Sequence, residues 1–174
     1  MLRKLEDTFF ARDCLEVAPA LVGKWLVRRL PDGSEARLRI TETEAYRGEE
    51  DTACHAHKGR TPRTALLYGR HGYYYVYLCY GIHWLLNVIT GKEGQPQGVL
   101  IRACAGYAGP GKLTKHLGIT GQQNGSLCAG NPELWLEDDG TPCRVITDTR
   151  VGIGYAAPED QAKLWRFKLA PEEA

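Results

Sequence analysis

Two glutamates and a tyrosine alternate along one short segment, Glu42-Thr43-Glu44-Ala45-Tyr46. In an extended strand these alternate side chains share one face, with the two carboxylates about 7 Å apart. Like charges at that separation disfavour simultaneous ionisation, which raises the pKa of one carboxyl group and suits it to acid–base chemistry. A carboxylate beside a tyrosine can activate a water while the ring holds a planar substrate. The spacing alone favours a simpler interpretation, an exposed strand edge with two surface glutamates.

A possible metal-binding motif, Cys54-His55-Ala56-His57, follows this segment. Cysteine and histidine are zinc ligands, but a tetrahedral site needs further ligands, and no second pair at ligand spacing follows. We therefore predict no metal site. A histidine that donates a hydrogen bond to a phosphate or substrate and a plain surface histidine both stay open, with the surface histidine favoured. The six cysteines form no C-x-x-C pair, which indicates buried free thiols in a reducing compartment.

Five tyrosines lie within the eight positions 73–80. Aromatic residues on one face of a strand usually belong to the core, although each phenolic oxygen then needs a hydrogen-bond partner. On a basic surface such rings can instead stack against unpaired bases. Both interpretations stay open for the run as a whole. Tyr80 precedes Gly81, so we expect it at a hairpin tip, where an aromatic ring can wedge between base pairs.

The basic residues are unevenly distributed along a chain that is close to neutral overall, with 22 Lys and Arg against 21 Asp and Glu. Between Thr52 and Pro132 there are eight basic residues, all five histidines and a single acidic residue, Glu93. A neutral protein with such a segment can face a polyanion with one surface. Charges that cluster in sequence but scatter in space are the alternative.

The elements that must position these residues are mainly strands. We expect strands at 24–30 and 36–46, joined as a hairpin by the turn Pro31-Asp32-Gly33, because proline and glycine suit those turn positions. Further strands are predicted from β-propensity at 73–79, 83–90 and 98–104, with minor ones at 135–136 and 144–147. Helices are expected at 13–22, where Pro19 weakens the prediction, and at 112–117. Residues 47–63 and most of 106–132 are expected to be loops.

The length of the chain and the motifs that it lacks exclude several classes of protein. The 174 residues predict a single domain over 1–174. No apolar run approaches the roughly 20 residues that span a bilayer, and the N-terminal segment has no signal-peptide core, so we expect a soluble intracellular protein. The sequence also lacks G-x-x-x-x-G-K-[ST], G-x-G-x-x-G after a strand, G-x-S-x-G and H-E-x-x-H. Nucleotide binding, serine hydrolysis and zinc proteolysis therefore lose support.

Several segments together resemble the alkyladenine (3-methyladenine) DNA glycosylases, and they include T-E-A-Y, Y-V-Y-x-x-Y-G and L-I-R in register. The matching segments are 9–33, 39–63, 74–91, 98–103, 109–113 and 150–156. This resemblance implies an α+β (mixed) fold: a single compact domain that is rich in antiparallel β-sheet, with a few short helices and a β-hairpin that enters the minor groove.

The resemblance also implies roles for individual residues. Glu44 matches the general base that activates the attacking water, and Arg102 and the backbone of Val151, at the edge of the base pocket, match groups that help to hold that water. The other matching residues are the base-pocket groups Tyr46, His55 and Tyr77, the pocket residue Asn87 that disfavours the exocyclic amino group of guanine, and the intercalating Tyr80. Lys58, Arg60 and Arg63 are expected to contact the DNA backbone.

The implied reaction is hydrolysis of the N-glycosidic bond of alkylated or deaminated purines in double-stranded DNA, after the damaged nucleotide is flipped out of the helix. The substrate class comprises 3-methyladenine, 7-methylguanine, hypoxanthine and ethenoadenine. We expect no cofactor and no strand cleavage, and a monomer that is cytoplasmic, and associated with the nucleoid if the source is bacterial. A catalytically silent nucleic-acid-binding protein on the same scaffold is the alternative, and the retention of Glu44, Tyr46 and Arg102 favours the enzyme.

Two departures from the family pattern concern the loops. Thr64 follows T-P-R where the family often has asparagine. The segment 103–111 is shorter than in vertebrate members, so contacts made there do not transfer to this chain.

Overall fold

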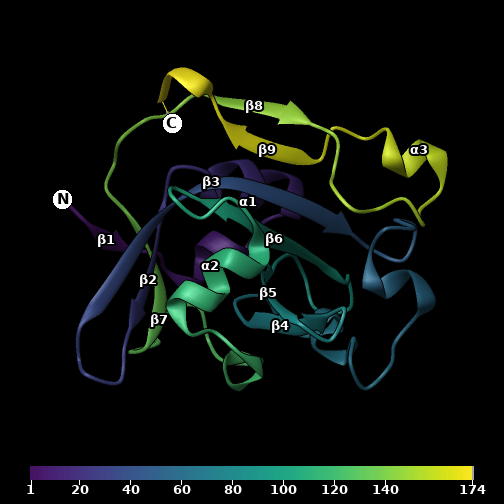
Figure 1. Ribbon diagram of the computed structural model, residues 1–174. Coiled ribbons are helices and arrows are strands. Elements are labelled where there is room, and N and C mark those ends of the chain that lie inside the picture. Colours follow the sequence, from purple (N-terminus) through teal and green to yellow (C-terminus); the bar gives the residue numbers. More distant parts are fainter. Residues whose placement is uncertain (174) are drawn as a thin grey trace.

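An antiparallel sheet is the centre of the structure, a computed structural model that describes residues 1–173 (Figure 1). Within these residues the sheet has nine strands, seven of them in the order β1-β7-β2-β3-β6-β5-β4, while β9 pairs with both β3 and β8. The strands are β1 (Arg3–Lys4), β2 (Trp25–Arg29), β3 (Glu35–Arg47), β4 (Tyr74–Cys79), β5 (His83–Ile89), β6 (Gln97–Cys104), β7 (Leu134–Asp138), β8 (Val145–Asp148) and β9 (Arg166–Leu169). The α+β fold class is thereby confirmed, whereas β1 and β9 were not predicted.

Strand β3 connects the two halves of the sheet. Its first half forms the expected hairpin with β2, in a register that pairs Trp25 with Arg39. Its second half lies between β6 and β9, so that Glu44 is opposite Leu100 on one side and Arg166 on the other. Irregularities in the pairing with β6 occur on both sides of Glu42. The two shifts cancel, so the pairing with β6 is back in its original register from Thr43 to Arg47.

The helices are short. The three α-helices are α1 (Cys14–Leu21), α2 (Pro110–Leu117) and α3 (Pro158–Gln161), and the 3-10 helices are η1 (Asp7–Ala11), η2 (His55–Lys58), η3 (Ala65–Tyr68), η4 (Gly121–Gln123) and η5 (Pro171–Glu173). Helix α1 begins where the Asp13 side chain accepts a hydrogen bond from the Leu15 amide, and Pro19 lies in its last turn. A proline there removes only one hydrogen bond, so the helix tolerates it. The expected loop at 47–63 is wrong in part, since it contains η2.

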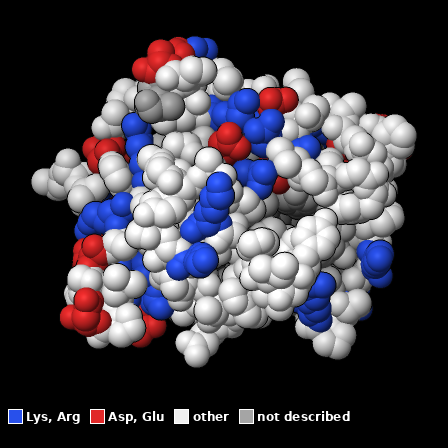
Figure 2. All heavy atoms as spheres, viewed as in Figure 1, with Lys and Arg blue, Asp and Glu red and all other residues white. Residues whose placement is uncertain are grey.

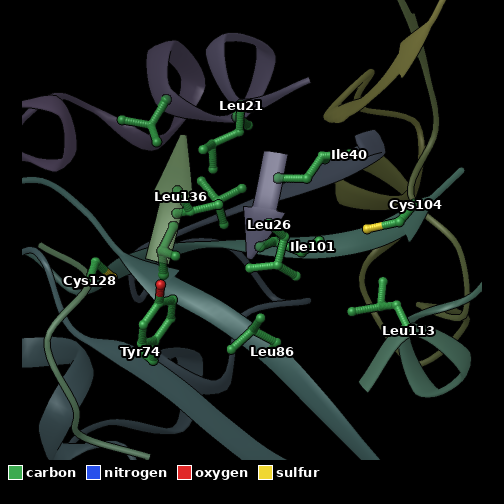
Figure 3. Close-up of a cluster of buried hydrophobic side chains, with 14 of the residues drawn as sticks. Leu21, Leu26, Ile40, Tyr74, Leu86, Ile101, Cys104, Leu113, Cys128 and Leu136 are labelled. Carbon is green, nitrogen blue, oxygen red and sulfur yellow. The ribbon is translucent and has the colours of Figure 1, made fainter. Parts of the chain in front are cut away.

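Helices α1 and α2 pack their apolar sides against the sheet and form the main core (Figure 3). Leu21 from α1 and Leu113 from α2 are both fully buried in one cluster with Ile40 of β3 and Ile101 of β6. A smaller apolar cluster lies around Leu67 and Ile89, beneath the loop that carries η2. None of the helices within residues 1–173 combines the length and the apolar composition that a bilayer crossing requires.

Candidate active site

The Glu44 carboxylate is buried and held from two sides. The Tyr46 hydroxyl donates a hydrogen bond to its Oε1 at 2.9 Å, and the Val151 backbone N–H donates to its Oε2 at 2.7 Å. Only 1% of the residue is exposed to solvent. The Nε atom of Arg102 on β6 lies 3.9 Å from Oε2, too far for a direct hydrogen bond. The structure therefore brings together Glu44, Tyr46, Arg102 and Val151 from three separate parts of the chain.

Burial raises the pKa of Glu44, and the hydrogen bonds from Val151 and Tyr46 partly oppose that effect, as do the positive charges of Arg102 and Arg150. Glu42 is not one of the groups that hold the Glu44 carboxylate, and the interpretation of both residues as surface glutamates is wrong for Glu44, which is 1% exposed. The Glu42 carboxylate instead accepts a hydrogen bond from Arg166 on β9 at 3.2 Å. The two glutamates keep the expected alternation beside β9, where Glu42 is opposite Lys168 and Glu44 is opposite Arg166, but the Arg166 cation pairs with Glu42.

A buried arginine links the strand of Glu44 to the segment of Val151. Arg150 binds the Asp51 carboxylate through both terminal nitrogens, at 2.7 and 2.9 Å, and donates a hydrogen bond to the Ala45 carbonyl at 3.0 Å. Its guanidinium also lies 4.9 Å from the ring centroid of Tyr46. No local pattern marked Arg150 or Asp51, because each acts through a partner 99 residues away.

An aromatic pocket of about 410 Å³, counting space open to solvent, lies next to the carboxylate and is joined to it by the Tyr46 hydroxyl. The lining residues are Tyr46, Ala53, Cys54, His55, Leu67, Tyr75, Tyr77, Asn87, Gly98 and Tyr155. Four of the five residues expected at a base pocket, Tyr46, His55, Tyr77 and Asn87, are therefore neighbours in space, whereas Val151 is not one of the lining residues.

His55 is held in the pocket as a neutral ring. Its Nδ1 lies 3.0 Å from the Tyr75 hydroxyl, and its ring centroid lies 4.4 Å from that of Tyr77. Burial lowers the pKa of His55 to about 4, and the positive charges of Arg63 and Lys58 add to the effect. The Tyr75 hydroxyl can donate a hydrogen bond to Nδ1. In that tautomer the Nε2 atom of His55 carries the proton and can itself donate a hydrogen bond.

The tyrosine run divides between three environments. Tyr74 is in the core, where its hydroxyl donates to the Leu134 carbonyl, while Tyr75 and Tyr77 line the pocket. Tyr80 stands at the tip of the β4–β5 hairpin and is 88% exposed. Its φ angle of 52° is the only positive value at a non-glycine residue among residues 1–173. A bulky residue in this conformation is strained, which suggests that the position serves function rather than stability.

Three basic residues lie on the segment 47–63, called the pocket loop below, but none of them is among the residues that line the pocket. Lys58, Arg60 and Arg63 are all exposed, and Arg63 lies 5.1 Å from the ring centroid of Tyr77. Figure 2 shows Lys and Arg side chains around a hollow on the right half of this face, while many of the Asp and Glu side chains lie along the left and upper edges. Thr64 is buried and stabilises the loop, since its hydroxyl donates to the Gly59 carbonyl at 3.0 Å.

The Cys54-His55-Ala56-His57 motif does not converge on a single point. Cys54 is buried, His55 faces Tyr75, and His57 points elsewhere with its Nδ1 2.8 Å from the Glu49 carbonyl oxygen. Across residues 1–173, no three His, Cys, Asp or Glu side chains lie close enough together to hold a metal ion.

Comparison with known sequences identifies the family. The sequence model of the methylpurine-DNA glycosylases matches residues 8–108 and 105–173 of this chain. The chain belongs to the methylpurine-DNA glycosylase family. The resemblance inferred from the sequence motifs is therefore confirmed, and membership makes the chain a DNA glycosylase, a hydrolase of N-glycosyl bonds.

Relatives of this chain occur in several organisms. The Arabidopsis thaliana protein named DNA-3-methyladenine glycosylase is 38% identical, in an alignment covering 97% of this chain and 72% of that one. Proteins provisionally named 3-methyladenine DNA glycosylase, from Methanocella arvoryzae and Anaeromyxobacter dehalogenans, are 42% and 44% identical. Those alignments cover 94% and 95% of this chain and 90% and 83% of the relatives.

Proposed function

We propose that this chain, acting over residues 1–174 as a single domain, excises alkylated or deaminated purines from double-stranded DNA. The proposed substrates are 3-methyladenine, 7-methylguanine, hypoxanthine and ethenoadenine. The observation that carries the proposal is the buried Glu44 carboxylate, fixed by Tyr46 and Val151 at the side of an aromatic pocket. A duplex base is out of reach of such a group, so the nucleotide must first be flipped into the pocket.

Glu44 is proposed to be the general base. A water placed between Oε2 and Arg102 Nε would bridge the 3.9 Å separation with two hydrogen bonds. As the bond between C1′ of the sugar and the base breaks, the base leaves with the bonding electron pair and positive charge develops on the sugar. The water oxygen then bonds to C1′ and its proton passes to Glu44. The raised pKa of this carboxyl group makes it a better proton acceptor than an exposed glutamate.

The pocket is proposed to select electron-poor purines. Tyr46, His55 and Tyr77 offer ring surfaces on which a flipped base can stack, and a positively charged alkylated base gains an additional attraction to tyrosine rings. Asn87 is oriented by a hydrogen bond from its Nδ2 to the Tyr75 carbonyl at 3.1 Å. We assign it the role of disfavouring the exocyclic amino group of guanine.

The DNA is proposed to approach the pocket by its minor groove. Tyr80 would fill the space that the flipped base leaves in the stack, since its ring is the most exposed aromatic side chain at the hairpin tip. Lys58, Arg60 and Arg63 would contact phosphates, which offsets the cost of unstacking and makes binding depend on salt. The protein is proposed to act as a monomer in the compartment that holds the DNA, with no metal or organic cofactor.

The test is a set of duplex oligonucleotides, each with one of the four lesions, beside an undamaged duplex of the same sequence. Incubation followed by hot alkali cuts the strand wherever a base has been removed. We expect cleavage at the lesion in at least one duplex and none in the undamaged control. Lesion binding without any base release would support the alternative, a silent DNA-binding protein on this scaffold.

A further inference from the structure

The two donors that hold the Glu44 carboxylate belong to segments that share one buried side chain. The Tyr46 hydroxyl binds Oε1, and Val151, the residue directly after Arg150, binds Oε2 through its N–H. Arg150 is positioned against both segments. Its guanidinium stacks 4.9 Å from the Tyr46 ring centroid and donates to the carbonyl of Ala45, the residue between Glu44 and Tyr46.

Arg150 is itself fixed from the opposite side. Its side chain is fully buried, and it pairs with an Asp51 carboxylate that is 1% exposed. It also donates to the Asp160 carbonyl at 3.3 Å and lies 5.0 Å from the ring centroid of Trp165. A planar guanidinium can make a two-pronged carboxylate pair, a carbonyl contact and aromatic stacking at the same time, which the single ammonium group of lysine does not.

The segment that follows Arg150 makes further contacts with the pocket loop, at Thr52 and Ala53. The Tyr155 hydroxyl donates to the Ala53 carbonyl at 2.8 Å, and the Thr52 backbone N–H donates to the Asp160 carboxylate at 3.0 Å. In Figure 1 this segment runs from the end of β8 to helix α3. In the Asp51–Arg150 pair both side chains are at most 1% exposed.

We propose that Arg150, held by Asp51, is a positioning residue that aims the Glu44 carboxylate by fixing the Tyr46 ring and the Val151 N–H. It touches neither the substrate nor the water, and it acts through those two donors. This proposal rests on the proposed function of Glu44 as the base. Loss of Arg150 would leave the carboxylate in place but free to rotate away from the water.

The consequence is a change in the pH dependence of excision. The charged or titratable groups that face Glu44 are Tyr46, Arg102, Arg150 and Tyr155, while Arg166, opposite in register, is bound to Glu42 and Asp148. The Val151 hydrogen bond and the Arg150 charge both lower the pKa of Glu44 against the effect of burial. A variant that weakens them raises this pKa, so the base loses its charge at a higher pH and excision falls earlier on acidification.

Two variants test the proposal. Arg150→Lys keeps the positive charge but loses the planar fork, and Arg150→Met combined with Asp51→Asn removes both charges so that neither is left buried without a partner. With lesion duplex at saturation, we expect single-turnover excision to fall about 100-fold, as misplacement of a reacting group typically causes. The midpoint of the acid limb should rise by about one pH unit, the worth of one hydrogen bond to a charged group. Lesion affinity should fall much less than the rate, because Tyr46 is only one of the rings that line the pocket.

Arg28→Met is the matched control. Arg28 is a second buried arginine, on β2, and its Nε donates to the Leu117 carbonyl at 3.1 Å, far from the pocket. This variant should melt at a lower temperature but keep the wild-type acid midpoint. A merely structural role for Arg150 predicts the same behaviour for the Arg150 variants.

The outcomes separate the two proposals. A wild-type midpoint in either folded Arg150 variant overturns the positioning role, and so does failure of both variants to fold, which would assign Arg150 to folding alone. If Glu44→Gln still excises lesions, the proposed function of Glu44 is wrong, whatever the Arg150 variants do. If Glu44→Gln is inactive and the midpoint is unmoved, only the role of Arg150 is lost.

Discussion

The Nε atom of Arg102 lies 3.9 Å from Oε2 of Glu44, and within residues 1–173 it is one of two buried side-chain polar atoms that have no hydrogen-bond partner in the protein. A buried donor without a partner is costly to stability, so it usually serves a purpose. Both groups can instead bind one molecule placed between them. This pair is the geometric basis on which we propose that Glu44 acts on a water.

Replacement of Glu44 by Gln should abolish excision and leave lesion binding nearly intact, because the shape is kept but the base is lost. The single-turnover rate should fall at least by the roughly 10²–10⁴-fold typical of general acid–base catalysis. Glu42→Gln is the matched control, since Glu42 is on the same strand but binds Arg166, and it should retain the wild-type rate. Equal rates in the Glu44 variant and the wild type would contradict the assignment.

Replacement of Tyr80 by Ala or Gly should weaken binding to lesion duplex about tenfold or more, while binding to undamaged duplex changes little. A wedge contributes only after a base has left the stack, and stacking of one ring is worth about 1–3 kcal/mol. The two variants should differ in stability. Because the backbone at this position has a positive φ, Gly should unfold at a higher urea concentration than Ala. Equal losses on both duplexes would make Tyr80 an ordinary surface residue.

The product should be an abasic site in an intact strand. Strand cleavage by a glycosylase uses an amine that forms a Schiff base with the sugar, and no lysine lines the pocket within the described residues. Lys58 is the nearest candidate in sequence to His55, but its side chain is exposed on the basic loop. Borohydride should therefore trap no enzyme–DNA adduct. A trapped adduct that disappears in Lys58→Ala would contradict the water mechanism and make the Lys58 amine the nucleophile.

Acidification should destabilise the fold through His55. Its pKa is about 4 in the folded protein, against an ordinary value of 6.5. Between pH 6.5 and pH 4 the unfolded chain therefore binds a proton at His55 that the folded protein does not bind. This proton stabilises the unfolded state as the pH falls. We expect the free energy of unfolding in urea to fall from neutral pH to about pH 4 by more in the wild type than in His55→Gln. The same pH dependence in both proteins would mean that His55 titrates normally.

Removal of a basic side chain from the pocket loop should reduce the salt dependence of DNA binding. Each phosphate contact contributes about 0.9 to the slope of log K against log salt, so Lys58→Gln, Arg60→Gln and Arg63→Gln should each lower the slope by up to about one. Arg29→Gln is the control, because Arg29 pairs with Glu35 at the far end of β2. A slope that falls equally in the control would indicate a general effect of net charge.

The strands could be predicted from sequence where the signal is local. The β2–β3 hairpin was expected from a proline–glycine turn between two predicted strands, and it is confirmed by the pairing of Trp25 with Arg39. Strand β9 was missed because its four residues, Arg-Phe-Lys-Leu, are too few to show a period. Only its pairing with the middle of β3, more than a hundred residues earlier in the chain, makes it a strand.

The candidate site was only partly accessible to sequence reasoning. The family motifs identified Glu44, Tyr46 and the pocket residues, and the structure brings them together, although their roles stay predictions. The interpretation of Glu44 as a surface glutamate was wrong, because the burial of this part of β3 between β6 and β9 leaves no mark in the amino-acid types. The Asp51–Arg150 pair could not have been found, since an isolated aspartate and arginine in two loops resemble any surface charges until the fold buries them.

Glu44 lies on a strand that is paired on both sides, and this determines when activity can appear during synthesis of the chain. The Ala45 amide donates to the Trp165 carbonyl at 2.9 Å, and Glu44 is opposite Arg166 in the register with β9. On the ribosome, a nascent chain that ends before residue 165 therefore lacks the strand that flanks Glu44 on one side. Base-excision activity should appear only after β9 has emerged and docked, so incomplete translation products would not release bases from DNA.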